Sequence, residues 1–543
     1  MSEARHNRQR RLAAITFTAL LTSAVVACGS GGSAGGGDTG AADGPPQAGG
    51  SLRIGISSDA ACLDPHQTGN HNVISMNRQV VDSLTDQDAE TLELAPWLAE
   101  SWEVNPTNTE FTFTLRDGVT FSDGTAFDSS VVKANLESIA ELGALSALGA
   151  AMVAGIQSID TPDPRTVVVR FSEPNAQFLT ATSTTTLGML APASLEAAPE
   201  ALCNGDGLIG TGPFTVESRT PDSATVLAKR EGYNWSSEFA EHTGDAYLDR
   251  IEFRIVPESS VRVGSLQSGE LEIIDGTAPQ DIPVLESSGF ALEARANPGI
   301  PMVLFLNREK PVWQDPAVRK AVQIGINRQQ LMDTLFTDLT PASKGALAAT
   351  TNGFVDQSEQ LAYNPDEARA LLEEAGYTRN GSGLYEKNGQ AVTFDVIQFY
   401  ANETPTIELM QQQLAEIGIG VEIRAMSSSE SDAVEAAGDW DTIYAHWTRP
   451  DPDILRVILD STGENPYRNA PSELDALLQA QAVAPSQEER TQILGQALDF
   501  IVDDAVLIPI HDFVNVWAMT ESVQGFTFDS GSRLKLYDTW LSS

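Results

Sequence analysis

The ten-residue segment HWTRPDPDIL (residues 446–455) combines an imidazole, an indole, a guanidinium and two carboxylates. Asp451 and Asp453 could act as a general acid and base, although carboxylates two residues apart are more typical of a solvated turn. The histidine with these carboxylates could hold a metal ion. The tryptophan and the arginine could instead form the wall of a ligand cavity. The apolar run TIYA before the segment predicts a buried strand, which would deliver these side chains to the edge of a core.

Motifs of enzyme chemistry are absent from the sequence or lie in an unsuitable context. The G-x-S-x-G pattern at residues 31–35 lies in a glycine-rich run without the strand and helix that a nucleophile elbow needs. Gly210-Thr211-Gly212 lacks the third glycine of a dinucleotide site and is followed by Pro213. The sequence contains no P-loop, HExxH or CxxC motif. We therefore expect a protein that is not an enzyme and has no cofactor.

The histidines do not predict a metal site. Five of them follow the N-terminal region, at His66, His71, His242, His446 and His511. None shares an element with another at the spacing of metal ligands. His71 and His446 could still meet in space, so the sequence leaves that one pair open.

The N-terminus has the pattern of an export signal. Four arginines precede the 16-residue apolar run 12–27, which is short for a membrane span but suits the core of a signal peptide. The run ends in VVAC, which resembles a bacterial lipobox. Residues 1–27 are therefore predicted to be a lipoprotein signal peptide, with Cys28 as the lipidated first residue of the mature protein. Residues 28–50 are predicted to be a glycine-rich tether.

Length, charge and cysteines restrict the class of protein further. A chain of 543 residues exceeds one ordinary core, so we expect two or three lobes. The 33 basic against 75 acidic residues give a net charge of −42, which repels nucleic acid and anionic lipid headgroups. Beyond Cys28, only Cys62 and Cys203 remain. In an oxidising exterior these two can form a disulfide, or they can stay as two small buried thiols.

Hydrophobic periodicity predicts strands and helices that alternate along the chain. Strands with alternating apolar residues are predicted at 51–57, 111–118, 166–171 and 251–256. The segment 364–376 predicts a helix, because Asn364 can cap it, Pro365 suits its first position and Gly376 can end it. The expected fold class is therefore mixed α/β.

Six blocks of sequence, in order, resemble the bacterial extracellular solute-binding proteins of family 5, which feed peptide and nickel ABC importers. The first block, LAESWEVNPTNTEFTFTLRDGVTFSDGTAFDSSVVKANL (98–136), resembles the signature of that family. The other blocks lie at 209–216, 247–273, 305–332, 363–377 and 410–423. The resemblance therefore extends from about residue 51 to the C-terminus.

The resemblance implies an α/β fold of the periplasmic-binding-protein-like type II (class C), with two hinged lobes and an extra inserted domain. Lobe I would combine residues 51–95, 205–300 and 510–543. Lobe II would be an insertion of residues 96–204, and lobe III would span residues 301–509. A ligand would lie between lobes I and III, and closure of these lobes would bury it.

The function that the resemblance implies is capture of a peptide or similar small solute and its delivery to the permease subunits of an ABC importer. The protein would be a monomer, bind no nucleic acid and be held by its lipid anchor outside the cytoplasm, in a periplasmic space or on the outer face of the cell. A nickel chelate or another anionic solute is the alternative ligand within the family. A secreted hydrolase is the alternative outside the family, but the sequence offers no nucleophile and base pair for it.

Two segments are expected, by resemblance, to contact the ligand. The spacing after Asp64-Pro65-His66 aligns Asn70, His71 and Asn72 with a loop that contacts extended peptides in the family. The alternative for these three residues is a plain polar turn.

The second segment is the one that contains Trp447, which matches a family tryptophan and offers a flat apolar wall, with His446 beside it. In peptide-binding relatives, an aspartate forms a salt bridge with the α-amine of the peptide. The segment is shorter here, and Arg449 stands near the place of that aspartate. Asp451 corresponds to the later turn. A guanidinium in a closed cleft favours a carboxylate and repels an ammonium. We therefore hypothesise that Arg449 faces an anionic ligand. The alternative is a local ion pair of Arg449 with Asp451 or Asp453.

Overall fold

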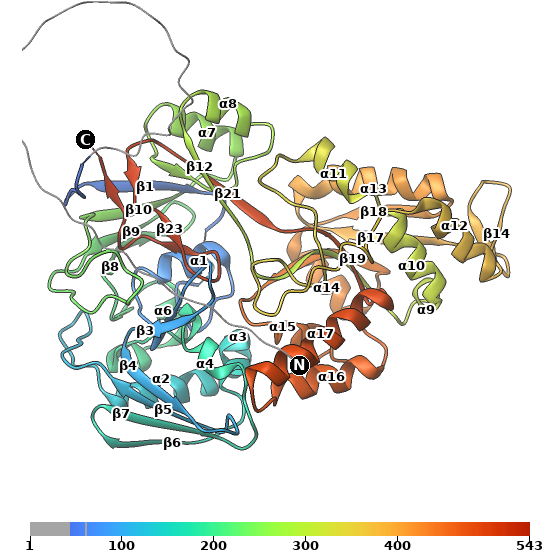
Figure 1. Ribbon diagram of the computed structural model, residues 1–543. Coiled ribbons are helices and arrows are strands. Elements are labelled where there is room, and N and C mark those ends of the chain that lie inside the picture. The colour runs from blue at the N-terminus through green and yellow to red at the C-terminus, as the bar shows by residue number, and fades with distance from the viewer. Residues whose placement is uncertain (1–43, 60–61, 543) are drawn as a thin grey trace, which may run out of the picture. The chain divides into compact units, whose positions relative to one another are not determined.

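The computed structural model describes residues 44–59 and 62–542 (Figure 1). These described residues form one compact unit. The predicted signal peptide and the predicted lipidation site, Cys28, lie outside the described residues. Within the described residues, no helix combines the length and the apolar character that a membrane span requires.

The largest sheet has seven strands in the order β12-β21-β11-β1-β10-β9-β8. These strands are β1 (Ser51–Ile56), β8 (Phe214–Thr220), β9 (Ala224–Lys229), β10 (Arg250–Ile255), β11 (Ile273–Ile274), β12 (Ala291–Ala296) and β21 (Val514–Met519). β1 is parallel to both of its neighbours, β10 and β11, and its alternating residues Leu52, Ile54 and Ile56 are buried. The predicted strands at 51–57 and 251–256 are confirmed. β8, β9 and β10 are consecutive strands, whereas the pairs of β1 and β21 with their neighbours join distant stretches of the chain.

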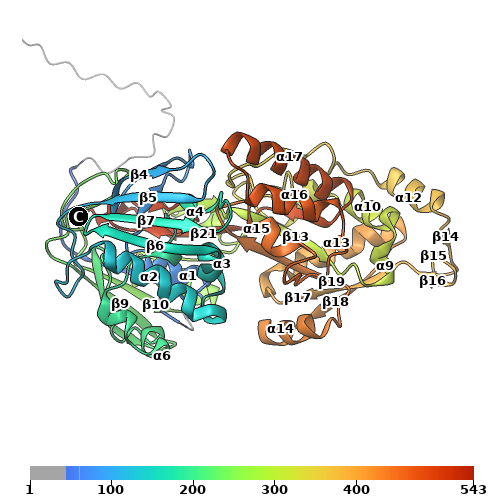
Figure 2. The ribbon, with the colours of Figure 1, turned by 90° about the horizontal axis from the view of Figure 1, so that it is seen from below.

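A second sheet is antiparallel, with four strands in the order β4-β5-β7-β6. The strands are β4 (Ala99–Val104), β5 (Glu110–Leu115), β6 (Ile156–Asp163) and β7 (Thr166–Phe171), which confirms the strands predicted at 111–118 and 166–171. Helix α2 (Ser129–Leu142) runs along one side of the sheet (Figure 2). Phe111, Phe171 and Phe178 pack edge to face, with ring centroids 4.8 to 5.7 Å apart. Their core is continuous with the core under the seven-stranded sheet.

The third large sheet has five strands in the order β18-β17-β19-β13-β20. The strands are β13 (Gly299–Leu306), β17 (Thr393–Gln398), β18 (Gly420–Ala425), β19 (Thr442–Thr448) and β20 (Leu507–His511). Every residue of β13 is buried. Met302 and Leu304 pack into one apolar cluster, while Val303 and Phe305 pack into another, because successive side chains of a strand point to opposite faces. The sheet is therefore covered on both faces.

Two groups of helices provide this cover. Helices α10 (Pro316–Gly325), α11 (Arg328–Leu335), α12 (Pro365–Glu374) and α13 (Thr404–Ile417) form one cluster, and α15 (Ile454–Leu459), α16 (Glu473–Ala482) and α17 (Gln487–Asp503) form the other. In α12 the Asn364 side chain accepts a hydrogen bond from the backbone N–H of Glu367, and Pro365 takes the first position. The helix predicted at 364–376 is confirmed.

The remaining elements are short. The helices among them are α1 (His71–Asn77), α3 (Ala147–Val153), α4 (Phe178–Ala181), α5 (Pro192–Leu195), α6 (Pro199–Cys203), α7 (Ser259–Gln267), α8 (Ile282–Ser287), α9 (Pro311–Gln314) and α14 (Ser428–Ala437), with 3-10 turns at η1 (Gly143–Ser146), η2 (Thr185–Leu187) and η3 (Ala401–Glu403). The strands among them are β2 (Thr85–Gln87), β3 (Leu94–Pro96), β14 (Thr378–Arg379), β15 (Tyr385–Lys387), β16 (Gln390–Ala391), β22 (Val523–Gln524), β23 (Thr527–Phe528), β24 (Leu534–Lys535) and β25 (Trp540–Leu541).

Two short segments connect the five-stranded sheet to the seven-stranded sheet. Asn297-Pro298 joins β12 to β13, and Asp512-Phe513 joins β20 to β21. The segments are side by side, since the N–H of Asn297 donates to the carbonyl oxygen of Phe513 at 2.8 Å. Paired crossings of this kind allow a few backbone rotations to change the angle between two packed bodies. The boundaries of the three predicted lobes remain predictions.

The Gly210-Thr211-Gly212 segment serves backbone packing. The N–H of Gly212 donates to the carbonyl oxygen of Val80 at 2.8 Å, and a Cβ atom on Gly210 would overlap that same oxygen. The hydroxyl of Thr211 accepts a hydrogen bond from the N–H of Asp82 at 3.0 Å. Glycine is therefore needed here for close approach of two chain segments.

Candidate functional site

A cavity of about 1350 Å³ lies where the two crossing segments pass between the sheets. Its walls come from the start of α1, the ends of β11 and β19, the start of β21 and the residues around η3 that lead into α13. Two large apolar side chains of the wall are exposed, Leu145 at 58% and Trp447 at 37%. A concave wall of apolar surface with a few polar groups is the usual form of a small-molecule site.

The predicted contact segment of Asn70, His71 and Asn72 lines this cavity as the N-terminus of α1. The Asn70 side-chain oxygen accepts hydrogen bonds from the backbone N–H groups of Asn72 at 3.0 Å and Val73 at 3.3 Å. The Asn72 amide donates to Asp275 at 3.3 Å. Both asparagine side chains therefore have structural partners, so the polar turn is a helix cap.

The end of β19 supplies two aromatic side chains, His446 and Trp447. His446 stacks on Phe513, with centroids 3.9 Å apart, and Trp447 donates from its indole N–H to the Tyr467 hydroxyl at 2.9 Å. Burial lowers the pKa of His446 to about 3, so its ring is neutral at neutral pH. Both side chains line the cavity.

Two carboxylates line the cavity, and each has a basic partner. Asp275 lies 3.2 Å from the guanidinium of Arg262, and Glu403 lies 3.2 Å from the ring of His511. Burial raises the pKa of Asp275, and Arg262 opposes only part of that rise. Burial also acts to raise the pKa of Glu403, but the hydrogen bond and charge of His511 outweigh it and hold the pKa below its ordinary value. Sequence reasoning did not identify these pairs, because their partners meet only in the fold.

Arg533 also lines the cavity and was missed from the sequence. It follows the turn between β23 and β24 and is 7% exposed. Its Nη1 donates to Nδ1 of His71 and, at 3.0 Å, to the carbonyl oxygen of Gly531. Burial lowers the pKa of Arg533 to about 10 and Asp529 opposes this, so the side chain is a cation at neutral pH. The stretch DSGSRLKL contains no motif that would have marked this arginine.

Arg449 and Asp451 are not among the residues that line the cavity. The backbone N–H of Arg449 donates to the Pro298 carbonyl oxygen at 2.9 Å, and its Nη2 donates to the Gln177 side chain at 2.6 Å. Asp451 pairs with Arg490 of α17 at 2.6 Å. The hypothesised ligand contact of Arg449 is therefore not supported by its position. The alternative ion pair with Asp451 is not formed either within the described residues, because Arg490 occupies that carboxylate.

Cys62 and Cys203 form a disulfide, one of the two states that the sequence left open. The N–H of Leu63 donates to the carbonyl oxygen of Cys203 at 2.9 Å, so the backbones also pair at this point. The bond ties the segment before α1 to the end of α6. It lies away from the cavity wall, since neither cysteine lines the cavity.

His71 and His446 both line the cavity. The pKa of His71 is lowered well below its ordinary value, first by burial, then by Arg533 and by His446. Across the part of the chain that the structure describes, no three His, Cys, Asp or Glu side chains are grouped so as to hold a metal ion. Two neutral rings beside an arginine are better suited to hydrogen bonding than to charge neutralisation.

Comparisons with known proteins identify the family and the fold. The sequence model described as "Bacterial extracellular solute-binding proteins, family 5 Middle" matches residues 93–466. The glutathione-binding protein GsiB of Salmonella paratyphi A is 26% identical over 504 residues, which cover 88% of this chain and 93% of that protein. The structure of NikA from Brucella suis in complex with Fe(III)-EDTA has a TM-score of 0.78 at 22% identity and covers 91% of this chain and 100% of its own. DppA from Helicobacter pylori in complex with the peptide STSA has a TM-score of 0.75 at 22% identity, covering 92% and 99%.

Proposed function

Because the chain belongs to the bacterial extracellular solute-binding proteins of family 5, we propose that it is the lipid-anchored receptor of an ABC importer, which captures a peptide or similar small solute outside the cytoplasm. The fold is that of the periplasmic binding proteins, as the predicted fold class stated. The solute would be released unchanged to the permease subunits. The anchor would be an acyl group on Cys28, followed by the glycine-rich tether.

The observation that carries this proposal is the cavity at the paired crossings. Its volume of about 1350 Å³ exceeds the 300–1,000 Å³ typical of drug-sized ligands and leaves room for a short peptide or a chelate. Asn297 and Phe513, one residue from each crossing segment, line the cavity, so rotation about these segments would change the opening. A ligand that touches both sheets would stabilise the closed arrangement by its differential contacts.

A second candidate solute class is favoured by one observation. Recognition of an amine would require an unpaired carboxylate, whereas this cavity contains the arginine Arg533. This favours an anionic solute, including an anionic metal chelate, over a solute held by its amine.

Native mass spectrometry of the protein purified without denaturation tests the receptor function. We expect the protein to carry a small solute, to lose it on unfolding and to release it with an unchanged mass. Solution X-ray scattering should show a smaller radius of gyration with the solute than without it. Turnover of the solute would contradict the proposal. Identical scattering curves, together with no retained solute from any growth medium, would also contradict it.

The anchor is tested separately with Cys28→Ser. The variant is expected to leave the membrane fraction of producing cells, because the acylated sulfur is lost, while its solute binding is unchanged. Membrane fractionation followed by mass spectrometry of the N-terminal peptide measures both effects. Equal membrane association of the variant and the wild type would rule out the anchor.

A further inference from the structure

One charged side chain of the cavity wall, Arg533, has no ion-pair partner among the described residues. The two carboxylates, Asp275 and Glu403, face Arg262 and His511. The His511 ring lies between the Glu403 carboxylate and the backbone carbonyl oxygen of Asp512. Arg533 is an additional cation of the wall. Arg262 is paired with Asp275, so Arg533 is the arginine of the wall without a paired carboxylate, in a chain whose net charge is −42.

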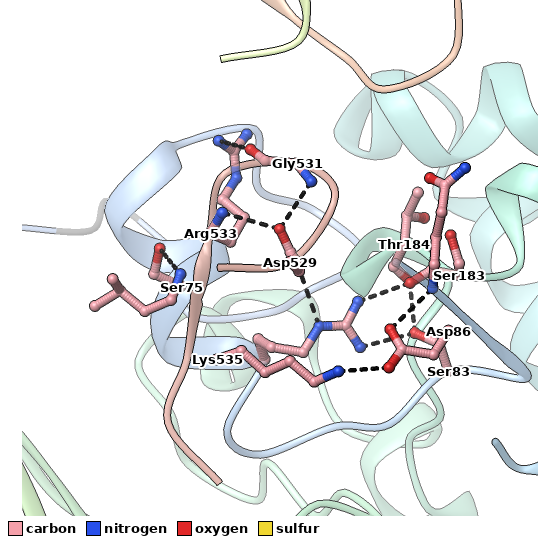
Figure 3. A network of polar contacts seen from close by, with 12 residues as sticks. Ser75, Ser83, Asp86, Ser183, Thr184, Asp529, Gly531, Arg533 and Lys535 are labelled. Atoms are coloured by element: carbon pink, nitrogen blue, oxygen red, sulfur yellow. Dashed lines mark hydrogen bonds and ion pairs between the residues drawn. The ribbon is translucent and has the colours of Figure 1, made fainter. Parts of the chain in front are cut away.

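The Arg533 guanidinium has no carboxylate partner among the described residues. Asp529, four residues earlier, accepts hydrogen bonds from the backbone N–H groups of Gly531 and Arg533, both at 2.9 Å, and pairs with Arg78 at 3.7 Å. Figure 3 shows the Asp529 carboxylate turned to these groups, while the Arg533 side chain points away from it. A buried cation without an anion is costly, and binding of an anion would offset that cost.

One edge of this guanidinium is free. Nη1 is occupied by His71 and Gly531, whereas Nε and Nη2 make no hydrogen bond to any described residue. The N–H bonds on the Nε–Nη2 edge are parallel, which is the geometry that binds both oxygens of a carboxylate. The edge is therefore suited to a planar oxyanion.

His71 adds a further donor in the same cavity wall. Its Nδ1 accepts a hydrogen bond from Arg533, so in the neutral ring the proton resides on Nε2. The Nε2 atom is buried and has no hydrogen-bond partner among the described residues. A buried donor without an acceptor is rare in proteins, and an acceptor supplied by a ligand would satisfy it.

The turn that carries Arg533 is held in place from two sides. On one side, the backbone N–H of Leu534 donates to the Ser75 hydroxyl at 3.3 Å, and the Gln79 amide donates to the Leu534 carbonyl oxygen at 2.7 Å. On the other side, Arg295 donates to the Ser532 hydroxyl at 2.9 Å. The guanidinium is therefore oriented before a ligand arrives, which lowers the entropic cost of binding.

We propose that Arg533 and His71 form an oxyanion subsite that binds a carboxylate of the solute, so that this receptor selects acidic solutes. The inference rests on the proposed receptor function and adds the chemical class of the solute. Both carboxylates of the wall, Asp275 and Glu403, have partners, so a free amine on the solute finds no unpaired carboxylate. A free carboxylate on the solute strengthens binding because it can pair with Arg533. Trp447 and Leu145 provide apolar surface for the remainder of the solute.

Four terminal forms of one dipeptide test the subsite by isothermal titration calorimetry. The ligands are alanyl-phenylalanine with both ends free, its N-acetyl form, its C-terminal amide and the doubly modified form, with glutathione as a further carboxylate probe. We expect amidation to weaken binding by about tenfold or more and N-acetylation to change it by less than about threefold. Inorganic phosphate is the competitor that distinguishes a phosphate site, and phosphate binding tighter than every carboxylate form would overturn the assignment.

Substitutions separate the subsite from a structural role of the turn. Arg533→Gln is expected to lower affinity for the carboxylate forms by about ten- to a hundredfold and to remove the difference between acid and amide. Arg533→Lys keeps the charge but loses the bidentate edge, so its affinity should be intermediate. Arg295→Gln is the matched control, because it removes a contact to the same turn from outside the cavity. Should Arg533→Gln fail to fold by circular dichroism, His71→Phe removes the Nε2 donor and should weaken binding by about fivefold.

Further results would overturn the subsite. They are amide forms that bind as tightly as acids, equal losses in Arg533→Gln and Arg295→Gln, and no binding of any carboxylate form. A retained neutral or cationic solute would also overturn the subsite, yet it would leave the receptor function intact. The two proposals therefore fail in distinguishable ways.

Discussion

Replacement of Asp451 by alanine is expected to lower the free energy of unfolding by about 3–5 kcal/mol, since it leaves a buried arginine without its carboxylate. Asp451 is 5% exposed and Arg490 is 1% exposed. The two form a bidentate pair with distances of 2.6 and 3.0 Å. Denaturant titration followed by tryptophan fluorescence measures the change.

The controls for this prediction separate burial from charge alone. The double variant Asp451→Leu with Arg490→Met should recover much of the loss, because it removes both buried charges. Asp366→Ala breaks the ion pair of Asp366 with Arg369. The Asp366 side chain is 93% exposed, so the substitution should change the free energy of unfolding by less than about 0.5 kcal/mol. A loss for Asp451→Ala no larger than that of Asp366→Ala would contradict the argument.

The same pair has a pH dependence with a definite sign. Burial acts to raise the pKa of Asp451, but Arg490 outweighs it, and the net pKa lies below the ordinary value. A carboxyl group whose pKa is lower in the folded state contributes stability above its unfolded pKa, about 3.9, and loses it as pH falls through the folded value. The stability difference between wild type and Asp451→Ala should therefore be full at neutral pH and shrink in acid.

Removal of the disulfide between Cys62 and Cys203 is the second change with a large expected effect. The two cysteines are 141 residues apart. Closing a loop of this length removes chain entropy from the unfolded state. This entropy loss alone corresponds to a stabilisation of about 5 kcal/mol, and measured losses on removal of a native disulfide are usually about 2–5 kcal/mol. The double variant Cys62→Ala with Cys203→Ala should therefore unfold at a clearly lower denaturant concentration than the oxidised wild type.

A reducing agent provides the control for the disulfide. The reduced wild type should match the double variant, and the double variant itself should not respond to the agent. Thiol titration under denaturing conditions checks that the bond is present in the oxidised protein. Oxidised and reduced wild type with the same denaturation midpoint would refute the prediction.

The position of Arg449 follows from contacts between parts of the chain that are remote in sequence. The N–H of Ala176 donates to the Ala482 carbonyl oxygen at 3.0 Å, next to the contact of Gln177 with Arg449. The Asn108 amide donates to the Ala484 carbonyl oxygen at 2.9 Å. These bonds join the segment before α4 and the turn after β4 to the end of α16. Arg449 lies in the contact surface between these segments rather than in the cavity wall.

The sequence alone determined the family and the mixed α/β fold class, as well as local elements such as the helix capped by Asn364 and the strand with buried Leu52, Ile54 and Ile56. Caps and periodicity act within a few residues, so they can be recognised without knowledge of the fold. Only the tertiary structure decided which arginines line the cavity, Arg262 and Arg533 rather than Arg449. Arg533 meets His71 across 462 residues because a C-terminal hairpin packs on α1, and no local pattern encodes that distance.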